Sequence, residues 1–359
     1  MLNLLVKVPF FKLYRSFEWP KMLPVSLTVS LTYRCNSRCM TCRVYERESN
    51  ELTLDEYGKI FHSIGHSPHW ITFSGGEPFL RQDMEEICIK AYELCRPKII
   101  NIPTNGILTE RIIEKVRCIQ AACPDAAIII NLSIDAIGEK HDDIRGSKGS
   151  FERVIETYKG LRSIKKDGNM TLGFHTVISK FNVGEIADIY RELKKYRPDS
   201  YITEIAEERT ELLTVNEKIS PSFSEYSSAV DYITGDMKDW EMKGIARVTR
   251  AFRKHYYHMV KKILRENRMQ IPCYGGLASC QLTPDGDVWA CCVKSEVLGN
   301  LRESGYDFKK IWFSQQAVQL RRAIKNRECF CPLANASYTN MLFSLKTLAQ
   351  VGTEVLLRK

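Results

Sequence analysis

The stretch Cys35-Asn36-Ser37-Arg38-Cys39-Met40-Thr41-Cys42 decides how the rest of this sequence is interpreted. Its three cysteines have C-x3-C-x2-C spacing and come directly after residues 25–33, where apolar and small polar side chains alternate. Alternation with a period of two predicts a strand with one apolar and one polar face. Helices would cover the apolar face, and the polar face would line a cavity.

The number of cysteines in this loop favours chemistry over structure. Iron–sulfur clusters are usually held by four thiolates, and a structural zinc site also closes with four ligands. Three ligands in one loop leave one metal position open, which a reacting site needs. The alternative is a group of buried or zinc-binding cysteines, because short cysteine clusters in intracellular chains often bind zinc.

A second motif follows the cysteine loop after one strand–helix–strand unit. Residues 70–73 predict a short buried strand that runs into Ser74-Gly75-Gly76-Glu77-Pro78. The two glycines let the backbone approach a ligand closely, the Glu77 carboxylate can hold an ammonium group, and Pro78 stiffens the exit. Together, the cysteine spacing and this motif make the chain resemble the radical S-adenosylmethionine (SAM) superfamily.

The resemblance implies a [4Fe-4S] cluster on Cys35, Cys39 and Cys42, whose open iron is chelated by the amino and carboxylate groups of SAM. One electron from the cluster would break the sulfur–C5′ bond, and the 5′-deoxyadenosyl radical would abstract a hydrogen from the substrate. The protein would position these groups and exclude water. Thr41 departs from the family pattern, in which many members carry an aromatic residue before the last cysteine.

The composition is that of a folded chain in a reducing compartment. The 359 residues are 44% hydrophobic and 26% charged, with a net charge of +9. This is enough for one barrel-sized domain and a smaller one. Thirteen cysteines without a signal peptide favour the cytoplasm, and no apolar window reaches the ~18 residues of a membrane span. No motif for binding nucleic acid is present, so we expect no such partner.

Residues 25–206 alternate between strand-like and helix-like segments, as parallel β/α units do. Six strands are expected at 25–33, 70–73, 98–103, 127–134, 171–178 and 200–206, and five helices at 53–65, 82–95, 108–122, 150–166 and 184–196. They predict an α/β fold, a partial (β/α)6 TIM-like barrel, because a full barrel usually needs about 250 residues. The cysteine loop and the glycine turn both lie at the carboxyl ends of strands, where chemistry gathers in such sheets.

Other polar residues end predicted strands at the same edge. Asn105 ends the third strand, although Asn-Gly is usually only a turn. The pattern S-I-D…H-D-x-I-R-G…G-S-F, from Ser133 onward, closely resembles radical SAM enzymes that carry a C-terminal SPASM or twitch domain. By this resemblance, Ser133 contacts the ribose or carboxylate of SAM, and Arg145 contacts the carboxylate. Asp135 could instead cap a short helix. His175 could touch adenine or substrate, or be a satisfied core histidine. The expected SAM-binding residues are Gly75, Gly76, Glu77, Asn105, Ser133, Asp135 and Arg145; no catalytic residue is assigned.

A second cysteine-rich unit occupies residues 273–335. A strand-like 281–283, the turn Pro284-Asp285-Gly286-Asp287 and a returning strand predict a hairpin, and a helix is expected near 307–326. The pattern C-x2-G…P-D-G-x-V-x-x-C…G-N-L…I-W…C-x-C resembles the SPASM/twitch domain. We expect a small α+β domain with one auxiliary [4Fe-4S] cluster, although Cys280 or Cys292 could substitute as a ligand and a zinc site is the alternative. The expected ligands are Cys273, Cys291, Cys329 and Cys331.

Three further segments complete the expected organisation. Residues 1–24 are apolar and basic, and they either cover the bottom of the barrel or lie on a membrane surface. Residues 207–272 are expected to form a helical basic linker. Its charged face is either simply solvated or attracts an anion. Residues 336–359 are an apolar helix that caps the barrel or shares the membrane surface.

The sequence therefore predicts a radical SAM enzyme, of oxidoreductase type, in which substrate is oxidised, epimerised or joined. Only 34 residues precede Cys35, which favours a small or lipid-linked saccharide over a peptide, because peptide-modifying relatives often carry a longer leader-binding domain. The alternatives are a maturase-type enzyme that modifies peptides or proteins, and a non-catalytic iron–sulfur or zinc protein. We expect a cytoplasmic protein, with possible membrane contact through the N-terminus, and a reductant such as flavodoxin or ferredoxin.

Overall fold

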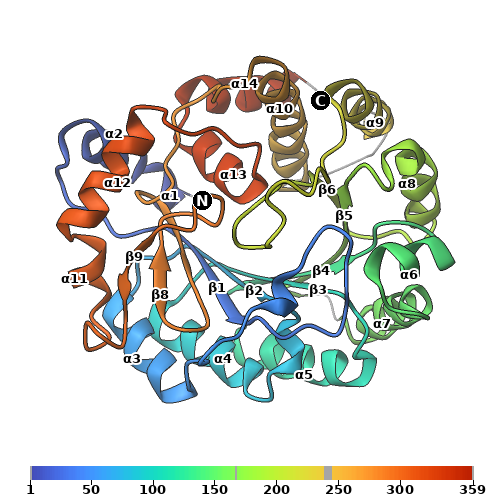
Figure 1. Cartoon of the computed structure of the whole chain (residues 1–359), viewed down its shortest axis with the longest axis horizontal. Coiled ribbons are helices and arrows are strands. Elements are labelled where there is room, and N and C mark those ends of the chain that lie inside the picture. Colours follow the sequence, from blue (N-terminus) through green and yellow to red (C-terminus); the bar gives the residue numbers. More distant parts are fainter. Residues whose placement is uncertain (1, 166–167, 238–244, 358–359) are drawn as a thin grey trace.

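The computed structural model describes residues 2–165, 168–237 and 245–357. It is built on one curved nine-stranded sheet in the order β6-β5-β4-β3-β2-β1-β7-β8-β9 (Figure 1). The first six strands are parallel to one another. They are β1 (Ser26–Thr32), β2 (Trp70–Gly75), β3 (Ile99–Thr104), β4 (Ala127–Ser133), β5 (Met170–Ile178) and β6 (Ser200–Ile205).

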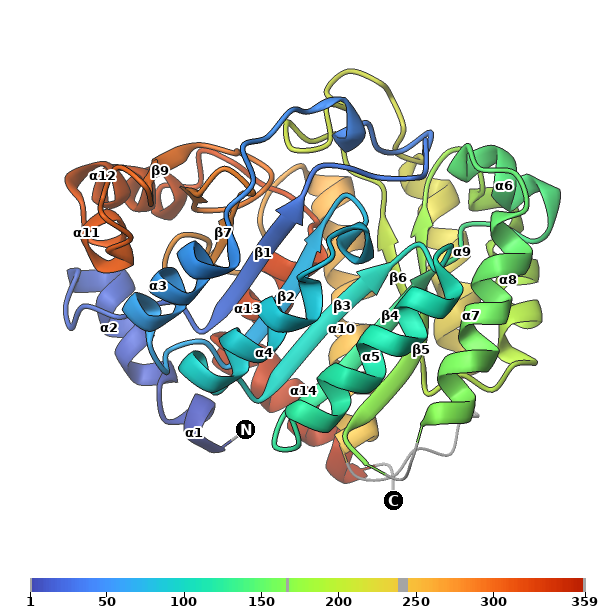
Figure 2. The ribbon, with the colours of Figure 1, turned by 90° about the horizontal axis from the view of Figure 1, so that it is seen from below.

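Helices cover the convex face of these strands, as Figure 2 shows. They are α3 (Leu54–Ile64), α4 (Met84–Cys95), α5 (Thr109–Ala122), α6 (Glu139–Arg145), α7 (Ser150–Ile164) and α8 (Ile186–Lys194). Five of them match the predicted helices, and the short α6 is additional. The expected partial barrel of parallel β/α units is confirmed.

The alternation in β1 has the expected effect. Leu27, Val29 and Leu31 are fully buried in the main core. The side chains between them point to the concave side, where Ser30 accepts a hydrogen bond from Gln281 Nε2 at 2.9 Å. The strand therefore has an apolar face under the helices and a polar face inside the barrel, because successive side chains point to opposite faces.

The sheet does not end at β1, and this was not predicted. The strand β7 (Ser279–Leu282) pairs in parallel with β1, from Ser26↔Ser279 to Val29↔Leu282. The expected hairpin is formed by β7 and β8 (Asp287–Trp289), which pair in antiparallel fashion, and β9 (Val297–Asn300) then pairs antiparallel with β8. The barrel and the second cysteine-rich unit therefore share one sheet.

The helix expected near 307–326 is two helices, α11 (Phe308–Trp312) and α12 (Gln315–Lys325). Ser314 interrupts them, because its hydroxyl accepts a hydrogen bond from the Ala317 amide at 3.2 Å and caps α12.

The linker forms two helices, α9 (Phe223–Asp236) and α10 (Ile245–Glu266). Part of the basic run has a structural task. Arg253 is buried on α10 and donates a hydrogen bond to the carbonyl of Tyr201, at the open edge of β6. This covers an edge that would otherwise present unpaired backbone groups. Residues 238–244, where the expected run begins at Lys243, lie outside the described residues.

The N-terminal helices pack against the beginning of the C-terminal helical segment. The helices α1 (Leu2–Leu5) and α2 (Val8–Phe17) pack beside the loop at Tyr274, together with Phe343 between α13 (Ala334–Leu342) and α14 (Leu345–Leu357). In turn, α14 is joined to α10 through the ion pair of Glu354 with Lys254. None of the helices in the described ranges has the length and apolarity needed to cross a bilayer.

Candidate functional site

The cluster loop, residues 33–43, follows β1 at the carboxyl edge of the sheet (Figure 2). Two backbone hydrogen bonds hold it against the end of α6. Arg38 N donates to Arg145 O at 2.8 Å, and Met40 N donates to Ile144 O at 2.9 Å. At Gly146, an added Cβ would lie 2.4 Å from Arg38 O, so a side chain there would push the loop away. The H-D-x-I-R-G motif therefore supports the cysteines.

The predicted glycines Gly75 and Gly76 also contact this loop. A Cβ at Gly75 would lie 2.2 Å from Thr32 O, and a Cβ at Gly76 would lie 2.1 Å from Arg34 O. Gly76 N donates to Thr32 O at 2.7 Å. Close backbone contact explains both glycines, because Gly75 meets the end of β1 and Gly76 meets the start of the cluster loop.

Glu77 is buried beside this contact. Its carboxylate accepts hydrogen bonds from Thr104 Oγ1 and from Asn105 N, both at 2.8 Å. Burial raises the pKa of Glu77 to about 7, although these donors oppose the rise. A carboxylate in this position would gain from a cationic neighbour, which is the role expected for it toward the SAM ammonium.

The side chain of Asn105 reaches the cluster loop. Its Nδ2 donates to Asn36 Oδ1 at 2.7 Å and to Ser37 Oγ at 3.1 Å, and lies 4.0 Å from Cys35 Sγ. The Asn-Gly step is therefore more than a turn, because its amide anchors the loop that carries the first cysteine.

Asp135 and Arg145 form a buried ion pair, with Oδ2 and Nε 2.8 Å apart and side chains 2% and 12% exposed. Asp135 caps no helix among the described residues, since Gly138 is the N-cap of α6. Arg145 Nη1 also lies 3.7 Å from Cys39 Sγ. Ser133 ends the neighbouring strand β4, in register with His175 of β5. His175 Nε2 lies 3.5 Å from Glu204 Oε1, on β6.

The first three thiols fit an iron–sulfur cluster. Burial raises the pKa of Cys35 to about 11, raises the pKa of Cys42 to about 12, and also raises the pKa of Cys39. Donors nevertheless point at the sulfurs, from Arg145 and from Ser37 N, the latter 3.5 Å from Cys35 Sγ. Buried thiols with such donors suit a metal that binds them deprotonated.

The second set is assembled from three separate segments. Gly275 N lies 3.4 Å from Cys273 Sγ, and a Cβ at Gly275 would be 3.5 Å from that sulfur and 3.8 Å from Cys291 Cβ. Burial raises the pKa of each of the four thiols, and the proximity of the others in the set adds to it. The four predicted ligands therefore gather in one place. They are Cys273, Cys291, Cys329 and Cys331.

In the described ranges, no three His, Cys, Asp or Glu side chains converge closely enough to hold a single metal ion. A four-iron cluster separates its thiolates by the width of the cluster, so the two cysteine sets are compatible with clusters on this geometry.

The two remaining candidates differ. Cys280 lies on β7 opposite Leu27, in the apolar core. Cys292 packs beside Cys331 and accepts a hydrogen bond from Arg209 Nη1 at 3.4 Å. We therefore assign Cys280 to packing, and Cys292 to the surroundings of the second set.

Arg209 is a residue that the sequence analysis did not identify. It lies in the segment after β6, close to Glu211, whose carboxylate is 3.5 Å from Arg209 Nη1. Burial raises the pKa of both Cys42 and Cys292, and in each case the Arg209 guanidinium opposes that rise. One cation therefore acts on a cysteine of the first set and on Cys292, which neighbours the second set.

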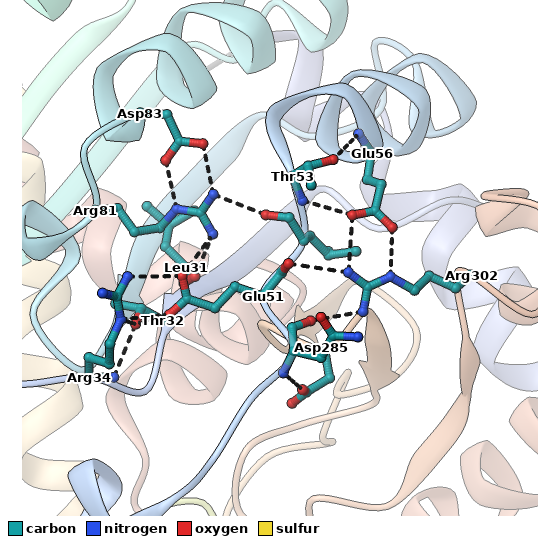
Figure 3. Close-up of polar contacts among 12 residues, drawn as sticks. Leu31, Thr32, Arg34, Glu51, Thr53, Glu56, Arg81, Asp83, Asp285 and Arg302 are labelled. Atoms are coloured by element: carbon teal, nitrogen blue, oxygen red, sulfur yellow. Dashed lines mark hydrogen bonds and ion pairs between the residues drawn. The ribbon is translucent and has the colours of Figure 1, made fainter.

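A polar network at the exit of the cluster loop was also missed (Figure 3). The buried Arg81 donates hydrogen bonds to Leu31 O and Leu52 O. It also pairs with both carboxylate oxygens of Asp83, each at 2.8 Å. Arg302, after β9, pairs with Glu56 on α3. The network fixes residues 50–56 between the barrel and the hairpin. No short sequence pattern marks it, because its members are scattered along the chain.

A partial barrel with three cysteines on one loop and four more beside its sheet is the arrangement expected of an enzyme that uses SAM and iron–sulfur clusters. The sequence profile of the radical SAM superfamily matches residues 29–193, and that of an iron–sulfur cluster-binding domain, SPASM, matches residues 273–332. A probable GTP 3′,8-cyclase of Methanocaldococcus jannaschii is 31% identical over 213 residues, 58% of this chain and 68% of the relative. The chain belongs to the radical SAM superfamily and carries a SPASM domain.

Other relatives cover more of the chain. An Fe-coproporphyrin III synthase of Methanosarcina barkeri is 28% identical over 83% of this chain and 76% of its own length. The mycofactocin maturase MftC of Mycobacterium ulcerans is 26% identical over 84% of this chain and 78% of its own length. SuiB of Streptococcus suis, bound to S-adenosylmethionine, has a similar fold, with a TM-score of 0.62 at 17% identity over 83% of this chain and 68% of SuiB. Membership implies a [4Fe-4S] cluster, SAM and auxiliary iron–sulfur chemistry.

Proposed function

We propose that this protein oxidises its substrate by radical chemistry, with SAM cleaved beside Cys35, Cys39 and Cys42 and an electron leaving through a cluster on the second cysteine set. Both sets are supported by the geometry described above. The observation that carries the proposal is Arg209, whose Nη1 lies 3.4 Å from Cys292 Sγ, beside the second cysteine set, and whose charge also opposes the rise in the pKa of Cys42. A cation close to an electron-transfer site stabilises an added electron there.

When bound, the cluster and SAM supply a 5′-deoxyadenosyl radical that takes a hydrogen atom from the substrate. The residues of the chain prepare the site for this step. Glu77 offers a buried carboxylate for the SAM ammonium, and Arg145, whose side chain is 12% exposed, offers a guanidinium for its carboxylate. Asp135 keeps Arg145 in place, and Asn105 holds the cluster loop. Cys273, Cys291, Cys329 and Cys331 would hold a cluster that accepts one further electron from the substrate, and with the loss of one proton this would complete a two-electron oxidation.

We propose a peptide or a protein side chain as the substrate. The maturase MftC is similar over most of this chain. The structures of SuiB bound to precursor peptide SuiA and of anSMEcpe with a bound peptide share the fold, with TM-scores of 0.61. The saccharide preference gains no support from the relatives described here.

A tetrapyrrole is the second candidate, because the Fe-coproporphyrin III synthase and an AdoMet-dependent heme synthase of the same organism are similar over 83% of this chain. Porphyrin carboxylates would suit a basic chain with a net charge of +9.

Anaerobic reconstitution tests the enzyme. With dithionite and SAM, the protein should form 5′-deoxyadenosine, and the Cys39→Ala variant should lose this activity and the iron of one cluster while it keeps the second. Absence of 5′-deoxyadenosine with every candidate substrate, together with unchanged iron in Cys39→Ala, would instead favour the non-catalytic iron–sulfur or zinc protein.

The substrate class needs a separate measurement. Peptides encoded beside the gene, coproporphyrin and nucleotide-linked sugars are each incubated with the reconstituted protein, and products are read by intact mass. A mass loss of two hydrogens in a peptide supports the leading candidate, and the same loss in a sugar restores the saccharide preference. We further propose a cytoplasmic setting, with flavodoxin or ferredoxin as reductant and peripheral membrane contact through the N-terminal segment.

A further inference from the structure

The helix α2 has two apolar stripes, and only one of them is covered. Val8, Phe11 and Tyr14 are buried against the loop at Tyr274 and against Phe343. On the other side, Phe10, Leu13 and Phe17 are 45%, 40% and 74% exposed. A surface helix needs a single apolar stripe to dock onto its own protein, so the second stripe calls for another explanation.

Three more exposed apolar residues lie just before and just after α2 in the chain. Leu5, Val6 and Trp19 are 40%, 61% and 71% exposed. Residues 5–19 thus supply six of the 14 large exposed hydrophobic residues in the described part of the chain. Single exposed apolar residues are normal, whereas six within residues 5–19 are a concentration that calls for a partner. We call these six residues the apolar patch.

Positive charge lies beside the C-terminal end of the apolar patch, where Lys325 donates a hydrogen bond to Ser16 O, next to Phe17. Between α2 and α12 lies a pocket of about 80 Å³ whose lining includes five cationic side chains and one carboxylate, that of Glu18. Glu18 is already paired with Arg322, at 2.7 Å. Lys12 adds a further cation on α2 itself. The cations of the pocket are Arg15, Lys21, Arg321, Arg322 and Lys325. Arg321 is buried and donates to Gly276 O and Trp312 O, so the exposed cations are Lys21, Arg322 and Lys325.

We propose that the apolar patch and its basic border dock the protein on an anionic phospholipid membrane. Aromatic and aliphatic side chains would enter the interface between headgroups and acyl chains, and the cations would meet lipid phosphates. Trp19 suits the headgroup level, since its ring is apolar and its indole N–H is polar. The contact is peripheral, and it is independent of the reaction proposed above.

The charge pattern favours a membrane over a second copy of the chain. A two-fold dimer would place the same patch on both partners, so the cations around one patch would face those around the other. An anionic bilayer instead offers negative charge at the rim and hydrocarbon at the centre, which matches the arrangement seen here.

The position of the patch is compatible with catalysis on the membrane-bound protein. Figure 2 shows α1 and α2 on the side of the auxiliary strands, toward the end of the barrel away from the cluster loop. A membrane bound there would leave the mouth of the barrel open to substrate and reductant.

Vesicle sedimentation of the reconstituted full chain tests the proposal. Sucrose-loaded vesicles contain phosphatidylcholine with or without phosphatidylglycerol at roughly one lipid in three. We expect binding to the anionic vesicles that is at least about tenfold stronger than to the neutral ones and that falls as salt rises. The fluorescence of Trp19 should shift to shorter wavelength on binding, and Trp19→Phe should bind while losing this shift.

Matched variants separate the surface from the fold. Binding to anionic vesicles should weaken at least about tenfold in each of two double variants, Phe10→Ser/Phe17→Ser and Lys12→Glu/Lys21→Glu. The control variant Val215→Ser/Phe223→Ser removes exposed apolar residues outside the patch and should bind as the wild type does. Iron content and circular dichroism should match wild type throughout. Equal binding by the patch variants, equal binding to neutral vesicles, or a patch-dependent dimer in place of vesicle binding would overturn the proposal.

Discussion

The ion pair between Glu56, on α3 of the barrel, and Arg302, which follows β9, should couple these two parts of the protein by about 2 kcal/mol. Arg302 Nε lies 2.6 Å from Glu56 Oε1, and Nη2 lies 3.0 Å from Oε2 (Figure 3). The two side chains are 27% and 12% exposed. Two charge-assisted hydrogen bonds contribute roughly 1.5–3 kcal/mol each when buried, and a fully exposed pair contributes below about 1 kcal/mol. This pair lies between those limits.

A double-mutant cycle isolates this energy. Glu56→Ala alone also removes the capping interaction with Thr53 N, at 2.8 Å, and Arg302→Ala alone removes a bond to Asn50 O at the same distance. The cycle with Glu56→Ala/Arg302→Ala subtracts both losses. Arg302 also holds the pKa of Glu56 at about 2, mainly through its hydrogen bond, so Arg302→Ala should raise that pKa.

Hydrogen exchange on the anaerobic, reconstituted protein provides the measurement. The amide of Leu52 is the reporter, because it donates to Pro284 O at 2.8 Å across the same junction. A coupling of about 2 kcal/mol corresponds to roughly 30-fold in the local opening equilibrium. The control is the ion pair of Asp55 with Lys59 on the same helix. Asp55 Oδ2 and Lys59 Nζ lie 2.6 Å apart, but the two side chains are 78% and 53% exposed. Its cycle should give below about 0.5 kcal/mol. An equal result for the two pairs would refute the reasoning.

Three further predictions follow from the site. Gly76→Ala should displace the cluster loop, because the added Cβ would lie 2.1 Å from Arg34 O. This variant should lose about four irons per chain. The control variant Gly184→Ala should keep its iron, because an added Cβ there has nothing within 4 Å. Burial lowers the pKa of His141 from 6.5 to about 4, so the unfolded chain binds the proton at a higher pH than the folded chain does. The contribution of His141 to the free energy of unfolding is therefore complete above pH 6.5 and is lost as the pH falls toward 4. The free energy of unfolding, measured by urea denaturation between pH 7.5 and 5.5, should fall by up to about 1.4 kcal/mol per pH unit. The His141→Asn variant should reduce this slope, and an unchanged slope would show that another group titrates. Cys329→Ala should still form 5′-deoxyadenosine but no product, measured by liquid chromatography; full product formation would make the second set structural.

Periodic patterns made much of this fold predictable. The alternation in residues 25–33 places Leu27 and Val29 under helices and leaves Ser30 inside the barrel, because side-chain direction in a strand depends only on local geometry. The cysteine loop and the Gly75-Gly76 turn were placed at one edge for the same reason, since parallel strands end together.

The remaining features depend on contacts between distant residues. Gln281 bonds to Ser30 from 251 positions away, and nothing in either segment specifies the other as its neighbour. The same pairing turns Cys280 toward the core, which the count of cysteines alone left open. Arg209 was overlooked because an isolated arginine in a polar segment is usually solvated, and its burial depends on how the segment after β6 folds back.

The pairing of β1 with β7 also has a consequence for how the protein is made. Until the ribosome has added residues 279–282, β1 has one unpaired edge, and this edge leads directly into the cysteine loop. At roughly 5–20 residues per second, the 251 positions between Ser30 and Gln281 take on the order of ten seconds or more to synthesise. An unpaired, hydrophobic strand edge attracts other chains during that time. We therefore expect the nascent chain to need a chaperone, and iron–sulfur insertion to follow translation rather than accompany it.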